Sequence, residues 1–466
     1  MSLLTADNYL FYFCIHYNLP IFAVVDITKG IIMVKKFLFV TLMTMLCEAT
    51  IAEEKTLWTL AECIEYAIEH NITIETSRLS AMSADEDVKE SKAQLFPSLS
   101  LQTTQQGGYK PFGNSDAHAN KATYSADYGL NTSWTLWNGN KNRNNIKLKK
   151  TIAEQTHLNI QENINAVKEE ILRQYMQTLY VKEAVGVNEE ILRISKANTS
   201  RGEEMYKIGK ISKADLSQLQ AQEAADEYNV VDAKAQFEDC LLKMKDLLRL
   251  EYDAPFDVAD PESVNADVTI APRSASSVIS DALIMRPEMK NAALSIKEAE
   301  ISEQIAQAGK TPTISLTGGI GSNTMTGTGY SWNKQMKDNF SASAGLTLSI
   351  PLIDNRATKT AVNKARIQSE QALLQQEDMR LSLSTDIQGF WTNATANSRR
   401  YVSAEASVKS AQDSYNLLSE QFRLGLKNIV ELTNAKTALL NAQQNRLESK
   451  YTALLYLRLL DIYAGK

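Results

Sequence analysis

Histidine and cysteine, which often perform catalysis or bind metals, are few in this chain and lie far apart. The 466 residues include four histidines and four cysteines: His16, His70, His118, His157, Cys14, Cys47, Cys63 and Cys240. No H-x-x-x-H or C-x-x-C spacing joins them, and no Walker or G-x-G-x-x-G loop opens a helix after a strand. Cys63 and Cys240 lie in helix-like patterns, where we expect buried free thiols. We therefore predict that the protein is not an enzyme and holds no metal or cofactor.

The elements that could position a functional site begin with two stretches of strict alternation. In residues 340–350 apolar side chains alternate with serine, threonine and glycine, and Pro351 then ends the pattern because it lacks an amide hydrogen. Residues 124–136 alternate in a similar way. Successive side chains of a strand point to opposite faces, so each stretch predicts a β-strand with one apolar and one polar face.

Each of these strands is followed by helix-like runs of unusual length. Residues from about 142 to 197, and again from 201 to 250, contain no proline, and apolar residues recur at steps of three and four. A similar pattern fills most of the chain from Arg356 onward. At about 50 residues, or about 75 Å, such helices are too long for an ordinary globular domain. They predict a coiled coil or a helical tube.

The second half of the chain repeats the plan of the first half. Pro97 and Pro312 are 215 residues apart. The turns Y-K-I-G and F-R-L-G, which begin at Tyr206 and Phe422, are 216 residues apart. This nearly constant offset predicts a duplicated α+β fold, in which each copy is ordered helix, helix, strand, strand, long helix, long helix.

The N-terminal part of the chain differs in composition from these repeats. Met33 begins a basic and then apolar stretch typical of a signal peptide, so we predict that translation starts there and that cleavage follows Ala52. A lipidated Cys47 is the alternative, which the bulky Leu46 before it disfavours. The predicted segments are an untranslated upstream extension at 1–32, a signal peptide at 33–52, the first repeat at 53–250, a linker at 251–275 and the second repeat at 276–466.

Four strands per chain cannot close a barrel, and a membrane offers no water to satisfy open strand edges. Copies of the chain would therefore have to share strands, two copies giving eight and three giving twelve. An eight-stranded barrel fills its own interior, whereas a larger one leaves a lumen, which suits the small polar side chains of these strands. The aromatic residues Tyr124, Tyr128, Trp134 and Trp137 suit an interfacial girdle. A soluble sheet with one wet face is the alternative.

These features together resemble the TolC family of outer-membrane efflux channels, the outer membrane factors. The resemblance rests on P-L-I-D-N at 351–355, its copy T-L-W-N-G-N at 135–140 and the two aromatic-x-x-Gly turns, and it covers about residues 56 to 464. It implies a homotrimer with a 12-stranded β-barrel in the outer membrane of a Gram-negative bacterium, continuous with a periplasmic α-helical barrel. It also implies a passive exit duct of a tripartite efflux or type I secretion system. The partners would be outer-membrane lipid, a periplasmic adaptor (membrane fusion protein) and an inner-membrane transporter of the RND or ABC type.

The resemblance further implies a gate at the periplasmic tip. It assigns Lys427 and Asp215 to an ion pair that holds the tip closed, and Glu431 to a ring of carboxylates that attracts cations. Phe422 stands where the family often has tyrosine, so the hydroxyl link of that tyrosine is missing. At a second position where the family can carry an acidic residue, this chain has Asn434. The alternative is that the charged residues here form an ordinary solvated helix face.

The tip turns are also candidate contacts for the adaptor, and they include Tyr206, Gly209 and Gly425. A glycine in such a turn either permits close approach of another helix or supplies a φ that other residues avoid.

The rival interpretation is a periplasmic coiled-coil adaptor or adhesin without a pore. An adaptor would carry a β-rich lipoyl-like domain rather than two strand pairs between long helices. The net charge of −6 argues against a nucleic-acid partner in either case.

Overall fold

The computed structural model describes residues 57–109, 122–251, 253–259 and 268–465. The predicted extension at 1–32, the signal peptide at 33–52, Cys47 and His118 lie outside these residues.

The chain divides into two compact units. The first comprises Met1–Trp58 and Pro255–Asp257, and the second comprises Thr59–Ala254 and Val258–Lys466. In the first unit, strand β1 (Leu57–Trp58) brings the Trp58 ring to 5.9 Å from the Phe256 ring, centroid to centroid, next to the start of β4 (Asp257–Val258).

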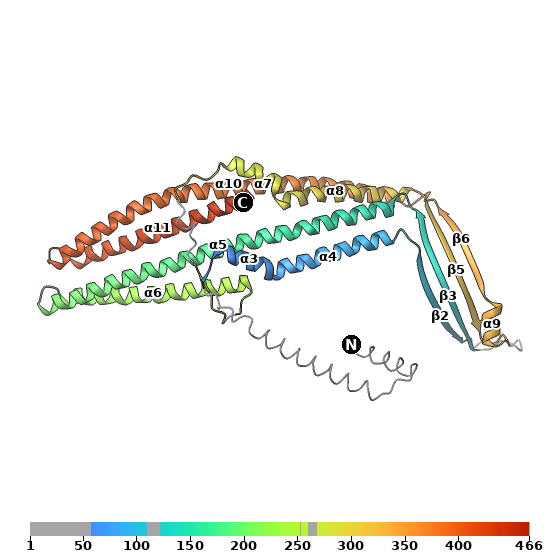
Figure 1. Ribbon diagram of the computed structural model, residues 1–466, viewed down its shortest axis with the longest axis horizontal. Helices are drawn as coiled ribbons and strands as arrows, with labels where there is room; N and C mark the ends of the chain where they lie inside the picture. The colour runs from blue at the N-terminus through green and yellow to red at the C-terminus, as the bar shows by residue number, and fades with distance from the viewer. Residues whose placement is uncertain (1–56, 110–121, 252, 260–267, 466) are drawn as a thin grey trace, which may run out of the picture. The chain divides into compact units, whose positions relative to one another are not determined.

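In the second unit the same order of elements occurs twice, which confirms the predicted duplication of the order (Figure 1). The first set is α3 (Leu60–His70), α4 (Ile72–Ala93), β2 (Ser98–Tyr109), β3 (Ala122–Trp137), α5 (Lys141–Lys207) and α6 (Lys213–Leu248). The second set is α7 (Ala275–Met285), α8 (Pro287–Gln307), the 3-10 turn η2 (Ala308–Lys310), β5 (Thr313–Met325), α9 (Trp332–Asp338), β6 (Ser341–Ser349), α10 (Ala357–Arg423) and α11 (Ile429–Tyr463).

The long helices α5 and α10 each contain 67 residues. The predicted interruption of the first one between 197 and 201 is wrong, because no proline or helix-ending glycine occurs there and Asn198 and Thr199 are packed in the interior. In the part of the chain that the structure describes, no helix combines the length and apolar character needed to cross a membrane.

Two segments rich in glycine contain regular structure. β2 continues through Gly107 and Gly108 because the start of β3 pairs with both residues. The segment from 321 to 338 contains the end of β5 and the short helix α9. Cys63 and Cys240 are buried free thiols, as predicted, and burial raises the pKa of Cys63 to about 12.

The four long strands form one antiparallel sheet in the order β2-β3-β5-β6. The register aligns the apolar faces of all four strands: one row across the sheet is Leu101, Leu130, Ile320 and Ala342. The next row, on the opposite face, is Gln102, Gly129, Gly321 and Ser341. Since a shift of one residue would exchange the faces, this register produces one apolar and one polar surface.

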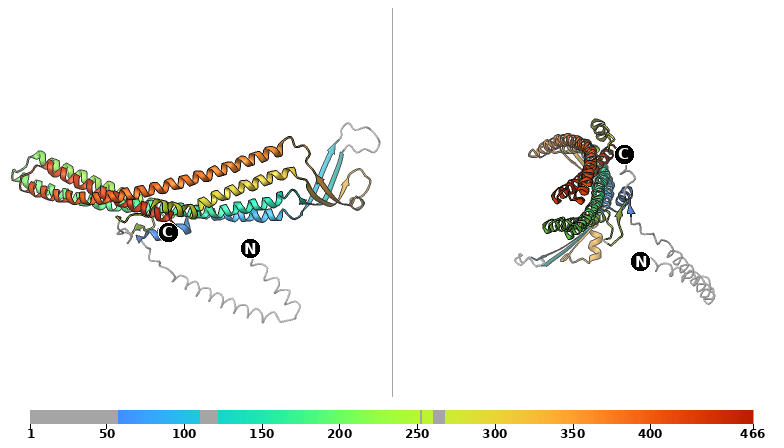
Figure 2. Two further views of the ribbon diagram at one scale, coloured as in Figure 1. Left: turned by 90° about the horizontal axis from the view of Figure 1, so that it is seen from above. Right: turned by 90° about the vertical axis from the view of Figure 1, so that its left-hand side faces the viewer.

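The helices of the second unit follow the same order as the strands to which they are joined. Near the sheet, α4 packs on α5, α5 on α8 and α8 on α10. Farther along, α6 packs on α5, α5 on α11 and α11 on α10. The outermost helices of these rows are therefore α4, α6 and α10, and the helices follow a curve when seen end-on (Figure 2).

Candidate functional site

The predicted tip turns join α5 to α6 and α10 to α11, and both have the same geometry. The Gly209 amide donates to the Tyr206 carbonyl at 2.9 Å, and the Lys210 amide donates to the Met205 carbonyl at 2.8 Å. The second turn repeats both bonds, from Gly425 to Phe422 at 2.9 Å and from Leu426 to Gln421 at 2.9 Å. This pair of bonds is the Schellman ending of a helix, which needs a left-handed residue after the last turn.

The two glycines supply that left-handed residue. Their φ angles are +76° at Gly209 and +79° at Gly425, and a Cβ added at either would meet no atom within 4 Å. The sequence left two roles open for these glycines: close approach of another helix, or a φ that other residues avoid. Within one chain the structure supports the second role.

Replacing Gly425 with alanine is expected to lower the free energy of unfolding by about 1–2 kcal/mol, the strain of a Cβ in this backbone region. Gly389 provides the matched control, because it lies inside α10, has open space around it and has no left-handed φ. Gly389→Ala should instead stabilise the helix by about 0.5–1 kcal/mol. The check is thermal unfolding followed by circular dichroism, and a stabilising effect of both substitutions would contradict the strain argument.

Polar side chains cap the helices that leave the two tips. At the start of α6, Asp215 accepts hydrogen bonds from the Ser212 amide at 3.0 Å and the Ser212 hydroxyl at 2.8 Å, while its own amide donates to Ser212 Oγ. At the start of α11, the Glu431 amide donates to Asn428 Oδ1 at 3.0 Å. Asp215 is therefore part of a local capping box in the single chain.

The structure brings two of the predicted gate residues together and leaves a third apart. Lys427 Nζ lies 2.6 Å from Glu431 Oε2, four residues along, and both side chains are about 40% exposed. Within the residues described for one chain, no ion pair joins Lys427 to Asp215. An exposed pair of this kind contributes only about 0–1 kcal/mol, so it can exchange partners easily.

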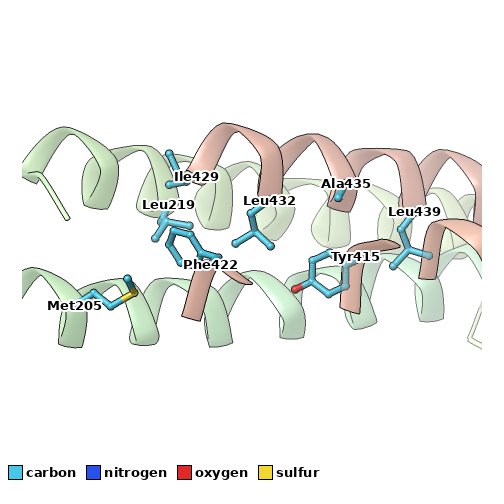
Figure 3. Packing of buried hydrophobic residues seen from close by; sticks show 8 residues of the cluster. All are labelled: Met205, Leu219, Tyr415, Phe422, Ile429, Leu432, Ala435 and Leu439. Carbon is cyan, nitrogen blue, oxygen red and sulfur yellow. The ribbon is translucent and has the colours of Figure 1, made fainter. Parts of the chain in front are cut away.

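Phe422 and Tyr206 occupy equivalent positions in the two tips but have opposite surroundings. The Tyr206 side chain is 42% exposed, whereas Phe422 is 2% exposed. Figure 3 shows the Phe422 ring among Leu219 and Ile429, in a cluster drawn from both helical hairpins. Phe422 thus packs the two tips of one chain against each other.

A buried polar cluster lies farther from the tips and joins three helices. Lys436 of α11 donates from Nζ to Ser195 Oγ of α5 at 2.8 Å and to Asp226 Oδ2 of α6. Ser195 Oγ also donates to that carboxylate, and Gln222 Nε2 donates to its other oxygen at 3.2 Å. Ser195, Asp226 and Lys436 are each no more than 3% exposed. Desolvation lowers the pKa of the Lys436 ammonium, and its attraction to Asp226 acts in the opposite direction.

Sequence reasoning missed this cluster, although a signal for it exists. Lys436 follows Leu432 by four residues and precedes Leu439 by three, and both leucines are buried. A lysine at that spacing lies in the apolar stripe of its helix, where a charge needs a buried partner.

The described histidines take part in ordinary local contacts. His157 lies 3.3 Å from Asp85, and His70 is stacked on Tyr66 with ring centroids 4.0 Å apart. No group of three or more histidine, cysteine or acidic residues in the described ranges could hold a metal ion.

Comparison with known proteins gives matches along most of the chain. The family model for outer membrane efflux proteins matches residues 63–248 and 278–465. Outer membrane protein TolC of Salmonella enteritidis is 28% identical over 188 residues, which is 38% of this chain and 37% of TolC. The pyoverdine export outer membrane protein OpmQ of Pseudomonas putida is 22% identical over 283 residues, which is 60% of this chain and 57% of OpmQ. The matched segments therefore span less than two thirds of either relative.

A likeness of fold extends over more of the chain. The crystal structure of the outer membrane protein VceC from Vibrio cholerae superposes with a TM-score of 0.72 at 17% identity, over 87% of this chain and 95% of VceC.

Proposed function

Because the chain belongs to the outer membrane efflux protein family, we propose that it is the passive exit duct of a tripartite efflux or type I secretion system. Three copies assemble in this proposal, so that their strands form a 12-stranded barrel in the outer membrane and their helices continue the tube into the periplasm. A periplasmic adaptor docks near the tip turns at Tyr206, Gly209 and Gly425. An inner-membrane transporter of the RND or ABC type delivers the cargo.

The two-faced sheet with open edges is the observation that carries this proposal. β2 and β6 are its edge strands, and the alternating directions make them antiparallel to each other. The β6 edge of one copy can therefore pair with the β2 edge of the next in an antiparallel ladder, which leaves no strand edge open after the ring closes. The polar face would then line a lumen, and the apolar face would meet lipid.

Exposed apolar side chains on the outer helices support the same closure. The middle helix α8 has no large apolar side chain that is exposed, and α11 has only Val430, next to the tip. The outermost helices expose several: Ile72, Leu79 and Met82 on α4, Tyr228, Val231 and Leu242 on α6, and Ile367, Leu374 and Leu381 on α10. In a ring, α10 of one copy would cover α4 and α6 of the next.

Extraction of the outer membrane with detergent tests the proposal. A ring closed by strand pairing should survive mild heating in detergent as a trimer, because no strand edge is left to start unfolding. Recovery of the protein as a soluble periplasmic monomer would contradict the duct and favour the coiled-coil adaptor or adhesin.

We further propose that Lys427 exchanges Glu431 for Asp215 of a neighbouring copy when the tip is closed, and that Glu431 contributes to a ring that attracts cations. In planar bilayers, Lys427→Ala should raise the occupancy of the conducting state by up to about fivefold, which corresponds to the loss of up to about 1 kcal/mol. Lys427→Arg keeps the charge and is the control that should stay closed. An unchanged closed-state conductance of Lys427→Ala would remove Lys427 from the gate.

A further inference from the structure

The short helix α9, Trp332–Asp338, lies at the end of the sheet away from the long helices (Figure 1). Ser322 Oγ of β5 donates to the Met336 carbonyl of α9 at 2.8 Å. The Trp332 ring meets Tyr128 of β3 edge to face, with centroids 6.4 Å apart. Tyr128 and Ser322 are direct cross-strand partners, so both contacts are made on one face. That face also carries Leu130 and Ile320 in the row two residues further on.

Hydrogen bonds hold α9 firmly in this position. The Gln335 side chain is buried, and its Oε1 accepts from the Met325 amide at 2.8 Å while its Nε2 donates to the Tyr330 carbonyl at 2.9 Å. Asn339 Nδ2 donates to the Asn323 carbonyl at 2.8 Å. Three points of attachment to β5 and its following turn make α9 a fixed feature of the outer end of the sheet.

The exposed side chains of α9 and of the turn before it include aromatic and basic residues and one carboxylate, Asp338. Tyr330 and Trp332 are exposed, and so are Lys334 and Lys337. Lys334 Nζ lies 4.3 Å from the centroid of the Tyr330 ring. Exposed aromatic rings beside lysines are the composition of a membrane–water interface, where rings lie at the headgroups and ammonium groups reach the phosphates.

The aromatic residues of β3 indicate where α9 lies relative to the apolar band of the sheet. Tyr124 and Trp134 lie on the same face of β3 and are separated by ten residues, or about 33 Å along the strand. A strand tilted by about 40° would then span about 25 Å, the height of the apolar band of outer-membrane barrels. Trp332 contacts Tyr128, which is four residues inside Tyr124, and Gln335 bonds Met325, the cross-strand partner of Ser125, so α9 lies between the middle of this band and its outer limit.

We propose that α9 is an interfacial anchor that binds anionic lipid headgroups through Lys334 and Lys337, with Tyr330 at headgroup level and Trp332 directed toward the sheet. This inference rests on the proposed function, because it requires the apolar face of the sheet to meet lipid. The helix also covers Ser322 and accepts its hydroxyl hydrogen bond, and so keeps this polar side chain out of the hydrocarbon.

Site-directed fluorescence in vesicles tests the anchor with the full chain. A fluorophore at Asn333→Cys on α9 is compared with one at Leu346→Cys on the apolar face and one at Ser343→Cys on the polar face, in a background with the other cysteines replaced by serine. The vesicles contain phosphatidylcholine with one third phosphatidylglycerol. Two preparations are compared, with the headgroup nitroxide on phosphatidylglycerol in one and on phosphatidylcholine in the other. At Asn333→Cys, labelled phosphatidylglycerol should quench at least about threefold more than labelled phosphatidylcholine, because each lysine near a membrane attracts anionic lipid.

The outcomes separate the anchor from the channel. Loss of the phosphatidylglycerol preference in Lys334→Gln/Lys337→Gln, with quenching at Leu346→Cys unchanged, would support the anchor. Equal quenching by both lipids at Asn333→Cys, or no quenching there, would overturn the anchor while leaving the channel intact. The absence of quenching at Asn333→Cys would also be expected if α9 contacted another protein instead of lipid. If an acyl-chain nitroxide fails to quench Leu346→Cys, the apolar face does not meet lipid, and the proposed function fails with the anchor.

Discussion

Lys436→Met is expected to lower the free energy of unfolding by about 3–5 kcal/mol, because it leaves the Asp226 carboxylate buried without its cation. Methionine matches the length of the lysine stem, so the loss of packing should be small. Ser195 and Gln222 would still donate to the carboxylate, but neither carries the charge that offsets its desolvation. The measurement is the shift of the urea midpoint of helix unfolding in detergent.

Two control variants isolate the effect of the buried charge. Lys427→Met makes the same chemical change at an exposed ion pair and should cost about 0–1 kcal/mol. Adding Asp226→Asn to Lys436→Met removes the unpaired charge and keeps an acceptor for Ser195, so the double variant should be more stable than the single one. If Lys436→Met were no worse than Lys427→Met, the cluster would not be a buried ion pair in solution.

The position of this cluster gives it a consequence for the tips. Its members come from α5, α6 and α11, so one set of hydrogen bonds joins the first helical hairpin of the chain to the second. Asn198 Nδ2 adds a bond to the Tyr415 hydroxyl at 3.1 Å between the same hairpins. Any movement that separates the hairpins of one chain must therefore expose a buried charge, which favours motion of each chain's two tips as a unit.

The strands and their faces could be predicted from the sequence because the signal is local. Alternation with a period of two determines which side chains share a face, and aligning the polar faces then excludes every register shift by an odd number of residues. Gly209 and Gly425 likewise mark their helix ends, since the left-handed residue of a Schellman turn is a property of the local backbone.

Other features depend on contacts that the sequence does not display. The predicted break near residue 200 was wrong because the second hairpin buries polar residues there, such as Asn198, a contact that the sequence does not display. α9 was missed because glycine, serine and threonine surround its seven residues. Its stability comes from Gln335, which accepts from the Met325 amide of β5, and from Ser322 of β5, which donates to the Met336 carbonyl.

The ion pairs at the tip illustrate the same difference. The predicted partner of Lys427 was Asp215, more than two hundred residues away, whereas in the single chain Lys427 lies on Glu431. A contact at four residues' separation on one helix requires almost no additional ordering of the chain, and the Ser212 capping box already engages Asp215. The conductance of the Lys427 variants therefore tests whether Asp215 pairs with Lys427 of a neighbouring copy.

Leu374→Glu is expected to prevent assembly of the proposed trimer while leaving the single chain folded. Leu374 is 71% exposed in one chain, and Ile367 and Leu381 lie seven residues to either side of it on α10. This heptad spacing is typical of a seam between two helices, and the opposite face of α10 is already packed through Ala372 and Leu383. A ring of three copies would bury three unpaired carboxylates, each at a cost of several kcal/mol.

Leu374→Met is the matched control, because it keeps an apolar side chain of similar volume and should leave assembly intact. Mass photometry in detergent measures the oligomer, and circular dichroism reports whether the helices of the monomer remain. A trimer of unchanged heat stability in Leu374→Glu would show that this stripe faces water, and the proposed contact of α10 with the next copy would then be wrong. A monomer with unchanged helical content would instead mean that the exposed apolar stripe stabilises only the contacts between copies.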